Sequence, residues 1–317
     1  MNDGYMNKIF LAVVCGPTAS GKTKLAVDLA REFDGEVVSA DSMQIYKGMD
    51  IASAKPTEEE KMGIPHHLMD FLDPRETFSV ADYAELARKA IADIHSRGKL
   101  PIMCGGTGLY INTVVDNIIF DGTGSDPAYR AELKALAEEK GAGYLLDMLA
   151  GIDPETAAQL HENNVKRVIR ALEVYRSSGR TMTEQKAASR LEPSPYEPCM
   201  MMIDFPREVL YERIDRRVDM MLEAGLIDEA REFFTHPDCA TAAQAIGYKE
   251  LKPFLDGQRT LEECTDELKR ATRRYAKRQL TWFKKDSRIE HISAENAVNY
   301  DKIYKNAENL IKKYSFL

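Results

Sequence analysis

The sequence has few of the features that mark secreted, zinc-binding or membrane proteins. Its five cysteines are an odd number, none stands in a Cys-x-x-Cys pair, and no cluster has the spacing of a zinc site. The apolar run 9–15 is only as long as a strand, and no charged segment with a long apolar stretch precedes it. We therefore expect a cytoplasmic protein in a reducing compartment, with no signal peptide and no membrane span.

Other absences narrow the choice of function. The sequence has no internal repeat, no low-complexity tract and no Asn-Lys-x-Asp string of the kind that reads guanine in GTP-dependent switches. The adjacent His66 and His67 point apart on either a helix or a strand, so we expect them to be structural and not metal ligands. No heptad seam or long apolar surface helix is found, which favours a monomer.

The net charge argues against a nucleic-acid partner, but its distribution does not. The 317 residues are 44% hydrophobic and 30% charged, which predicts two globular domains or one large one. The net charge is −8, whereas phosphate binding depends on Lys and Arg. Residues 1–160 hold 15 Lys and Arg against 25 Asp and Glu, and residues 161–317 hold 28 against 26. The second half is therefore expected to differ in function from the first.

Short apolar runs alternate with helical patterns in the first part of the chain. Buried strands are expected at residues 9–15, 36–40, 100–104 and 200–205. Helices are expected at 22–33 and 79–97, the second capped by Ser79 and Asp82 and stopped by Gly98. This alternation predicts an α/β fold with a parallel sheet, which binds ligands at the carboxyl ends of its strands.

The strand signal disappears between about residues 122 and 198. Short helices are expected there at 126–140, 143–150, 154–160, 165–178 and 181–189, between breaker-rich segments. We therefore expect a helical insertion, 122–198, in a core formed by 1–121 and 199–317. After the strand at 200–205 the core is again mostly helical and ends in a long helix at 260–285.

The strongest motif is GPTASGKT at 16–23, which follows the first expected strand and leads into a helix. Its Gly-x-x-x-x-Gly-Lys-Thr spacing is that of a P-loop, whose backbone N–H groups surround phosphate oxygens. Lys22 would reach the terminal phosphate, and the Thr23 hydroxyl would ligate Mg²⁺. The motif therefore predicts a P-loop NTPase-like core that binds a di- or triphosphate. The residues expected to bind it are Gly16, Pro17, Thr18, Ala19, Ser20, Gly21, Lys22 and Thr23.

Two further segments reach the same edge of the expected sheet, and each has two interpretations. Asp41 follows the second strand, where it could take a proton from a nucleophile, or could cap the following turn or help to hold the metal. The string GGTGLY follows the third strand at 105–110. Its glycines allow a ligand to approach the backbone and Thr107 could donate to a leaving oxygen, but a plain strand-to-helix turn explains the string as well.

Basic residues gather at three places in this acidic chain, namely 166–170, 213–217 and 269–288. The last segment holds nine Lys and Arg against one acid, with Trp282 and Phe283 among them. Each cluster alone fits a solvated helix face. Three clusters with interleaved aromatic residues favour contacts with an RNA backbone and stacking on its bases.

Taken together, these strings resemble the bacterial tRNA dimethylallyltransferases, also called isopentenyl-tRNA transferases. The matching strings are GPTASGKT (16–23), SADSMQIYKGMDI (39–51), AKP (54–56), PHHLMDFLDPRETFSVADY (65–83), GGTGLY (105–110), KRVIRALEVY (166–175), IGYKEL (246–251) and RRYAKRQLTWF (273–283). The chain departs from the family at Ala52-Ser53, where Gly-Thr is usual, and at Ala245-Ile246, where the pair is more polar or contains cysteine. These departures concern only local tRNA contacts.

The resemblance implies transfer of a dimethylallyl group from dimethylallyl diphosphate to N6 of the adenine directly 3′ of the anticodon, with release of diphosphate. It implies that Asp41 takes the proton of the adenine amine, that Thr107 contacts the bridging or leaving oxygen, and that Arg217 contacts the diphosphate. The insertion would grip the anticodon stem-loop. Residues implied to touch the tRNA are Asp41, Ser42, Met43, Gln44, Lys166, Arg167, Val168, Ile169, Arg170, Gln244, Ala245, Ile246, Gly247, Tyr248 and Lys249, to which the basic C-terminal helix adds Arg273, Lys277 and Arg278.

Two other classes of function fit parts of the sequence. In a P-loop small-molecule kinase, Asp41 would activate a hydroxyl group and Asp204 would be a metal ligand, but the basic clusters would have no role. A non-catalytic nucleotide switch or RNA-binding module would carry a guanine-reading motif if it depended on GTP, and this motif is missing.

Overall fold

The computed structural model describes residues 8–119, 126–189, 192–235, 239, 241–294 and 299–315. The chain divides into two compact units, one formed by 1–115 with 195–317 and the other by 116–194. In the described part of the larger unit, six strands form one sheet in the order β3-β2-β4-β1-β5-β6, and every pairing is parallel. The predicted α/β fold with a parallel sheet is confirmed.

The four predicted strands are present, and two further strands extend the sheet at its edges. Their bounds are β1 (Ile9–Cys15), β2 (Gly35–Ser39), β3 (His66–His67), β4 (Leu100–Gly105), β5 (Tyr196–Asp204) and β6 (Ile289–Ser293). Strand β3 has no recognisable pattern because it is two residues long, and β6 has none because exposed Glu290 and His291 interrupt its apolar residues. Since β1 lies between β4 and β5, the segment that follows β1 opens at the centre of the carboxyl edge.

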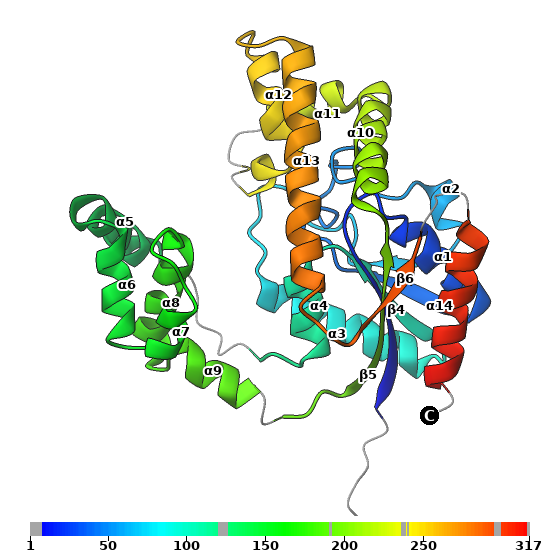
Figure 1. Ribbon diagram of the computed structural model, residues 1–317, viewed down its shortest axis with the longest axis horizontal. Helices are drawn as coiled ribbons and strands as arrows, with labels where there is room; N and C mark the ends of the chain where they lie inside the picture. The colour runs from blue at the N-terminus through cyan, green and yellow to red at the C-terminus, as the bar shows by residue number, and fades with distance from the viewer. Residues whose placement is uncertain are drawn as a thin grey trace, which may run out of the picture. The chain divides into compact units, whose positions relative to one another are not determined.

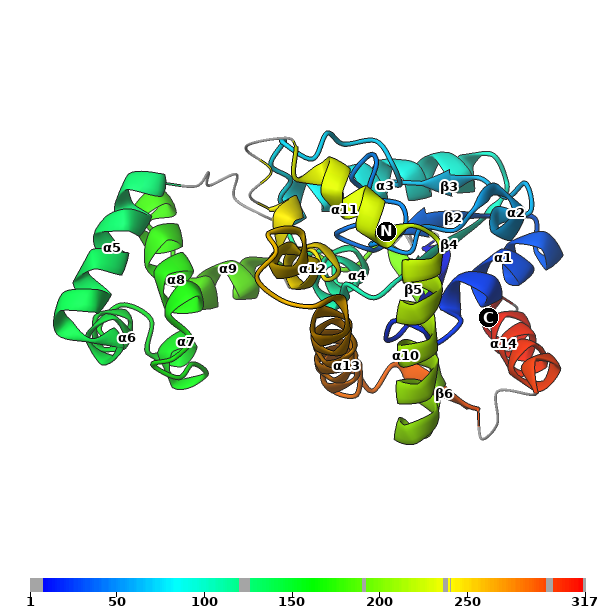
Figure 2. The same ribbon diagram turned by 90° about the horizontal axis from the view of Figure 1, so that it is seen from above.

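Helices cover both faces of the sheet (Figures 1 and 2). Alternate residues of β1 point to opposite faces, so that Val13 packs in one hydrophobic cluster and Val14 in the other. Val13 shares its cluster with α3 and α4, and Val14 shares its own with α1 and α14. The bounds of these helices are α1 (Lys22–Glu32), α3 (Val80–Ser96), α4 (Gly108–Val115) and α14 (Tyr300–Ser315). The C-terminal helix α14 was not predicted.

Helix α3 begins and ends where its sequence predicts. The Ser79 hydroxyl accepts a hydrogen bond from the Asp82 N–H, and the Asp82 carboxylate accepts one from the Ser79 N–H at 2.8 Å. Gly98 follows with a φ of 73°, a left-handed conformation that ends the helix. The capping residues therefore set where α3 begins and ends.

A third group of helices belongs to the larger unit, and Figure 1 shows α10 to α13 gathered at one of its ends. Their apolar side chains form a hydrophobic cluster with the segment after β2, including Ile45, Tyr46 and Met49. The predicted long helix is confirmed as α13. The bounds are α2 (Glu58–Lys61), α10 (Arg207–Glu223), α11 (Leu226–Phe233), the 3-10 helix η1 (Ala242–Gln244), α12 (Tyr248–Leu255) and α13 (Leu261–Phe283).

The smaller unit is helical and has a core of its own. Leu133, Leu145, Leu149 and Leu172 are among its buried residues. All five helices predicted for this region are present, with bounds α5 (Pro127–Lys140), α6 (Ala142–Ala150), α7 (Pro154–Ala158), α8 (Val165–Ser178) and α9 (Met182–Ser189). None of the helices in the described parts of either unit has the length and apolar character needed to cross a membrane.

Candidate active site

The predicted phosphate loop joins β1 to α1 at the carboxyl edge of the sheet. Gly16 and Gly21 have φ angles of 138° and 84°, which glycine adopts without steric cost. Ala19 also has a positive φ, of 63°, and its carbonyl oxygen accepts a 2.8 Å hydrogen bond from Nε of Arg213. Arg213, which comes from α10, therefore holds the loop in a conformation that alanine alone disfavours.

Two cations, Lys22 and Arg217, line the cavity beside this loop. Desolvation lowers the pKa of both, and a neighbouring cation lowers each further: Arg217 lowers the pKa of Lys22, and Arg213 lowers that of Arg217. The Lys22 ammonium donates to the carbonyl oxygen of Pro17 at 3.3 Å. Because both cations are partly desolvated, an anion such as a diphosphate is favoured between them.

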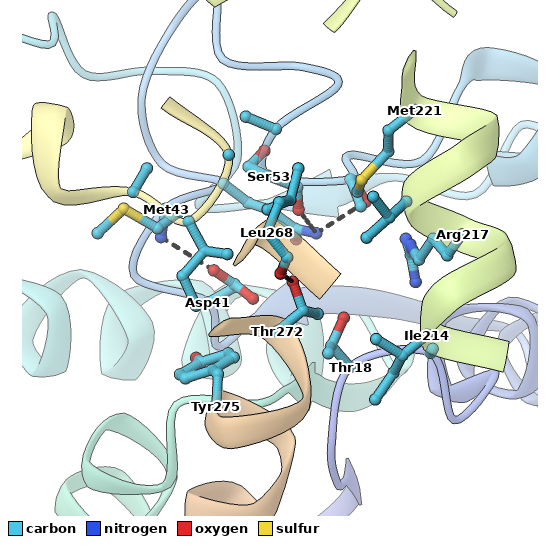
Figure 3. Close-up of a pocket in the computed structure, with 18 of the residues that line it drawn as sticks. Thr18, Asp41, Met43, Ser53, Ile214, Arg217, Met221, Leu268, Thr272 and Tyr275 are labelled. Carbon is cyan, nitrogen blue, oxygen red and sulfur yellow. Dashed lines mark hydrogen bonds between the residues drawn. The ribbon is translucent and has the colours of Figure 1, made fainter. Parts of the chain in front are cut away.

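The cavity has a volume of about 260 Å³ and combines polar and apolar walls (Figure 3). Its polar lining includes Thr18, Lys22, Thr23, Asp41 and Gln44, and its apolar lining includes Ile214, Val218, Met221, Leu226 and Leu268. All of these residues belong to the larger unit. The apolar wall makes the cavity suitable for a ligand that has a hydrocarbon part as well as an anionic part.

Asp41 lines this cavity at the start of the segment that follows β2 (Figure 3). Its Oδ1 accepts a 2.9 Å hydrogen bond from the Met43 N–H, so it caps the turn as one interpretation predicted. Since it also lines the cavity, the capping bond aims the carboxylate and leaves it able to accept a proton from a ligand.

The Gly-rich string after β4 lies against the same turn. The Thr107 N–H donates to the Ala40 carbonyl at 3.0 Å, and the Thr107 hydroxyl oxygen accepts from the Ser42 N–H at 3.1 Å. A Cβ atom at Gly105 would stand 2.2 Å from the Ala40 oxygen, so only glycine fits there. Tyr275 of α13 also contacts Thr107, and burial raises the pKa of this tyrosine. Thr107 and Asp41 are thus brought together by backbone contacts.

Glu229 of α11 organises two walls of the cavity, and sequence reasoning missed it. Its carboxylate accepts hydrogen bonds of 2.7 to 2.9 Å from the N–H groups of Asp50, Ile51 and Ala52, and another of 2.9 Å from the Tyr248 hydroxyl. The Ala52 contact is made by the backbone N–H, so it does not depend on the side chain at this position.

The other predicted tRNA-binding residues of the larger unit lie at different depths. Gln244, Ala245, Ile246, Gly247 and Lys249 line the cavity, as do Ser42, Met43, Gln44 and Arg278. Tyr248, by contrast, is fully buried. On α13, Arg273 forms an ion pair with Asp215, whereas Lys277 is exposed.

In the smaller unit, the predicted tRNA-binding residues 166–170 divide between surface and core. Lys166 and Arg167 are exposed at the start of α8. Val168 and Ile169 are buried in the hydrophobic core of the unit, so their side chains pack against its helices. Arg170 donates to the buried carboxylate of Glu173 at 2.7 Å. The exposed cations of this segment are therefore Lys166 and Arg167.

The kinase interpretation finds less support in the geometry. Asp204, its proposed metal ligand, lies at the end of β5 with Oδ2 3.3 Å from Nδ1 of His291, and it does not line the described cavity. His67 contacts Glu36 at 2.8 Å, as a structural residue would. Within the described ranges, no group of three or more His, Cys, Asp or Glu residues could hold a metal ion.

A parallel α/β sheet with a P-loop, two cations, a carboxylate and apolar side chains at one cavity is typical of the P-loop NTPase-like class of proteins and suits an anionic phosphate compound with a hydrocarbon part. The comparisons with known proteins are more specific. The family model described as IPP transferase matches residues 44–286. A tRNA dimethylallyltransferase of Halalkalibacterium halodurans is 50% identical over 303 residues, which cover 95% of this chain and 96% of that protein. The chain therefore belongs to the tRNA dimethylallyltransferase family, whose members are prenyltransferases.

Other relatives agree with this assignment. The tRNA dimethylallyltransferase of Bacillus subtilis is 47% identical over 281 residues, covering 88% of this chain and 89% of its own. The crystal structure of a tRNA isopentenylpyrophosphate transferase from Bacillus halodurans has a TM-score of 0.72 at 46% identity, covering 97% and 98% of the two chains. A eukaryotic dimethylallyltransferase acting on tRNA has a TM-score of 0.82 at 29% identity, covering 95% of this chain and 77% of that one. The predicted family is confirmed, and the kinase alternative is not supported.

Proposed function

We propose that this protein transfers the dimethylallyl group of dimethylallyl diphosphate to N6 of the adenine directly 3′ of the anticodon in tRNA, releasing diphosphate. One observation carries the proposal: a single cavity is lined by residues of the phosphate loop including Lys22, by Arg217, by Asp41 and by apolar side chains of α10, α11 and α13. We further propose that the enzyme acts as a cytoplasmic monomer.

The phosphate loop and the two cations would bind the diphosphate. Negative charge grows on the diphosphate as the allylic C–O bond breaks, and the desolvated Lys22 and Arg217 stabilise that charge more strongly than water would. Thr107, at the adjacent turn, would donate a hydrogen bond from its hydroxyl group to the bridging or leaving oxygen. These contacts would lower the barrier because they strengthen as charge develops on the leaving group.

The residues present fit a magnesium ion that binds together with the diphosphate. The Thr23 hydroxyl lines the cavity beside Lys22, and it is a hard oxygen donor of the kind Mg²⁺ prefers. Mg²⁺ takes one or two protein ligands and completes its shell with water and substrate phosphates, so it does not require a cluster of carboxylates. When bound, it would neutralise part of the diphosphate charge.

Asp41 would accept the proton of the nucleophile. The N6 amine of adenine forms a C–N bond to the allylic carbon while the C–O bond to diphosphate breaks, and the proton lost by N6 moves to the carboxylate of Asp41. The apolar residues Ile214, Val218 and Leu268 line the same cavity and would hold the dimethylallyl group away from water, which would otherwise capture the allylic carbon.

The adenine has to leave its stack to reach this cavity. Unstacking costs a few kcal/mol and is cheapest in a single-stranded loop, which fits an anticodon loop as the substrate. Gln244, Ile246 and Lys249 at the cavity would contact the loop, together with Arg278 of α13. The exposed Lys166 and Arg167 suit the helical unit to contacts with the phosphates of the stem.

The proposal is tested by incubating the protein with Mg²⁺, unmodified tRNA and dimethylallyl diphosphate labelled in its dimethylallyl group. We expect label in the tRNA and an equal amount of free diphosphate, without any requirement for ATP. Consumption of ATP without labelled tRNA would contradict the proposal and favour a phosphotransferase.

A further inference from the structure

The buried amide of Gln279 connects three parts of the site. Gln279 is only 5% exposed and lies on α13, whose neighbouring residues Lys277 and Arg278 are exposed to solvent. Its Oε1 accepts a 3.0 Å hydrogen bond from the Thr18 N–H of the phosphate loop. Its Nε2 donates a 2.9 Å hydrogen bond to the carbonyl of Gly106 in the Gly-rich turn. One side chain therefore sets the distance between two segments that are expected to contact the same diphosphate.

The bond to Thr18 also acts on Lys22. The Thr18 N–H and the Pro17 C=O belong to the same planar peptide unit, so fixing one fixes the direction of the other. The Pro17 carbonyl accepts from the Lys22 ammonium at 3.3 Å. Gln279 and Lys22 thus hold opposite sides of one peptide, and the position of the ammonium depends on the amide of Gln279.

The glycines of the Gly-rich turn support this arrangement independently. A Cβ atom at Gly106 would lie 2.2 Å from Nε2 of Gln279, and a Cβ atom at Gly108 would lie 2.2 Å from the ring of Trp282. Trp282 is one helical turn beyond Gln279 on α13. Both glycines therefore permit α13 to approach the turn, a purpose that neither sequence interpretation of this string included.

We propose that Gln279 is a positioning residue for the diphosphate. It holds the peptide before Thr18, the Lys22 ammonium and the turn that carries Thr107 in the geometry that binds one diphosphate group. The inference rests on the proposed function, because it assigns the substrate of the site to the diphosphate class. It concerns binding of the diphosphate and not recognition of tRNA.

The test compares the full-length Gln279→Met variant with the wild type and with Gln258→Met. Methionine keeps the approximate length of the side chain and removes both hydrogen bonds, whereas Gln258 is exposed and does not line the cavity. The dissociation constants of inorganic diphosphate with Mg²⁺ and of tRNA are measured separately, together with the two KM values. We expect Gln279→Met to weaken diphosphate binding and raise the KM for dimethylallyl diphosphate about 5- to 10-fold. The tRNA dissociation constant of Gln279→Met should stay within about twofold of the wild-type value. All four constants of Gln258→Met should also stay within about twofold of the wild-type values.

An unchanged diphosphate constant in a folded Gln279→Met protein overturns the inference. Equal loss of diphosphate and tRNA affinity also overturns it, because that pattern means general damage to the fold. Gly106→Ala gives a second measurement: it should weaken diphosphate binding in the wild type but add little to Gln279→Ala, since the shorter side chain leaves room for the new methyl group. If the losses of diphosphate affinity caused by Gly106→Ala and Gln279→Ala are additive in the double variant, the inference is contradicted. Diphosphate binding is measured without prenyl transfer, so absence of transfer by the wild type would overturn only the proposed function.

Discussion

Residues at the cavity divide into those that a local motif reveals and those that only the fold reveals. The phosphate loop and Asp41 could be predicted, because each follows a strand and strand ends meet at one edge of a parallel sheet. Gln279 and Glu229 could not. Gln279 is 261 residues from Thr18 along the chain, and Glu229 is 177 from Ala52, so no spacing rule relates them. Their functions follow from hydrogen bonds that exist only in the folded protein.

Asp41 is the residue whose replacement tests the chemistry most locally. Asp41→Asn keeps an oxygen that can accept from the Met43 N–H but removes the ability to take a proton. We expect kcat to fall by about 10²- to 10⁴-fold while the tRNA dissociation constant changes by less than about threefold. Rate and binding constants are measured on the same preparations, with the exposed Asp228→Asn as control. Equal losses in rate and in tRNA affinity would make Asp41 a residue that positions the tRNA.

Lys22 gives the diphosphate site a pH dependence. Desolvation lowers the pKa of Lys22, so its ammonium loses its proton at a lower pH than an ordinary lysine does. As pH rises, the loss of this positive charge should raise the dissociation constant of diphosphate. The rise should occur at a pH below the usual pKa range of lysine. Lys22→Arg should flatten this profile, because arginine stays charged. An identical alkaline profile in both proteins would assign the titration to another group.

Among the secondary-structure elements, most helices were predictable and the edge strands were not. Helices α3, α5 and α8 have capping residues or long apolar periodicity, which are local signals. Strand β3 is two residues long and is recognised only by its pairing with β2. The sequence of the basic segment on α13 also does not show which of its cations are paired. Arg274 forms an ion pair with Glu267, and Lys269 forms one with Asp219.

The contacts of Glu36 hold β2, β3 and α3 together and make the fold sensitive to acid. Hydrogen bonds from Arg97, and another from His67, lower the pKa of Glu36 to about 2. A carboxylate with a lowered pKa in the folded state adds stability above its unfolded pKa, near 4.5, and loses this contribution as pH falls towards 2. Glu36→Gln should therefore lower the free energy of unfolding by about 1–3 kcal/mol at neutral pH, with a difference that shrinks below pH ~4.5.

Urea denaturation between pH 7 and the acid limit of reversible unfolding measures this difference. The control is Glu85→Gln, which replaces an exposed partner of Lys89 and should change stability by less than about 0.5 kcal/mol. A pH-independent difference for Glu36→Gln would show that packing, and not its charge, accounts for the loss.

The exposed cations of α13 should account for its share of tRNA binding. Lys277 and Arg278 are exposed, whereas Arg274 is held by Glu267. We expect Lys277→Gln with Arg278→Gln to weaken tRNA binding and to reduce the slope of log K against log salt concentration by about 1 to 2. Arg274→Gln is the matched control and should change the slope less. An unchanged slope in the double variant would indicate a solvated face with no phosphate contacts.

At the scale of the whole molecule, the net charge does not indicate which partner the protein binds. The chain carries −8 overall, yet its described residues include basic side chains at the cavity, on α13 and at the start of α8. Bulk charge reflects solubility, and the local cations are the groups that would contact phosphates. The α/β unit contains the cavity proposed to bind diphosphate, and the helical unit has its own core and exposed cations.

The central claim is that the cavity joins the dimethylallyl group to the exocyclic amine of one adenine. It is tested most directly with two anticodon stem-loop RNAs, one with adenine and the other with inosine at the position 3′ of the anticodon. Inosine has the same ring system but no exocyclic amine. With labelled dimethylallyl diphosphate and Mg²⁺, we predict label in the adenine RNA and none in the inosine RNA. Equal labelling of both RNAs, or labelling of neither while full-length tRNA is labelled elsewhere, would contradict the account.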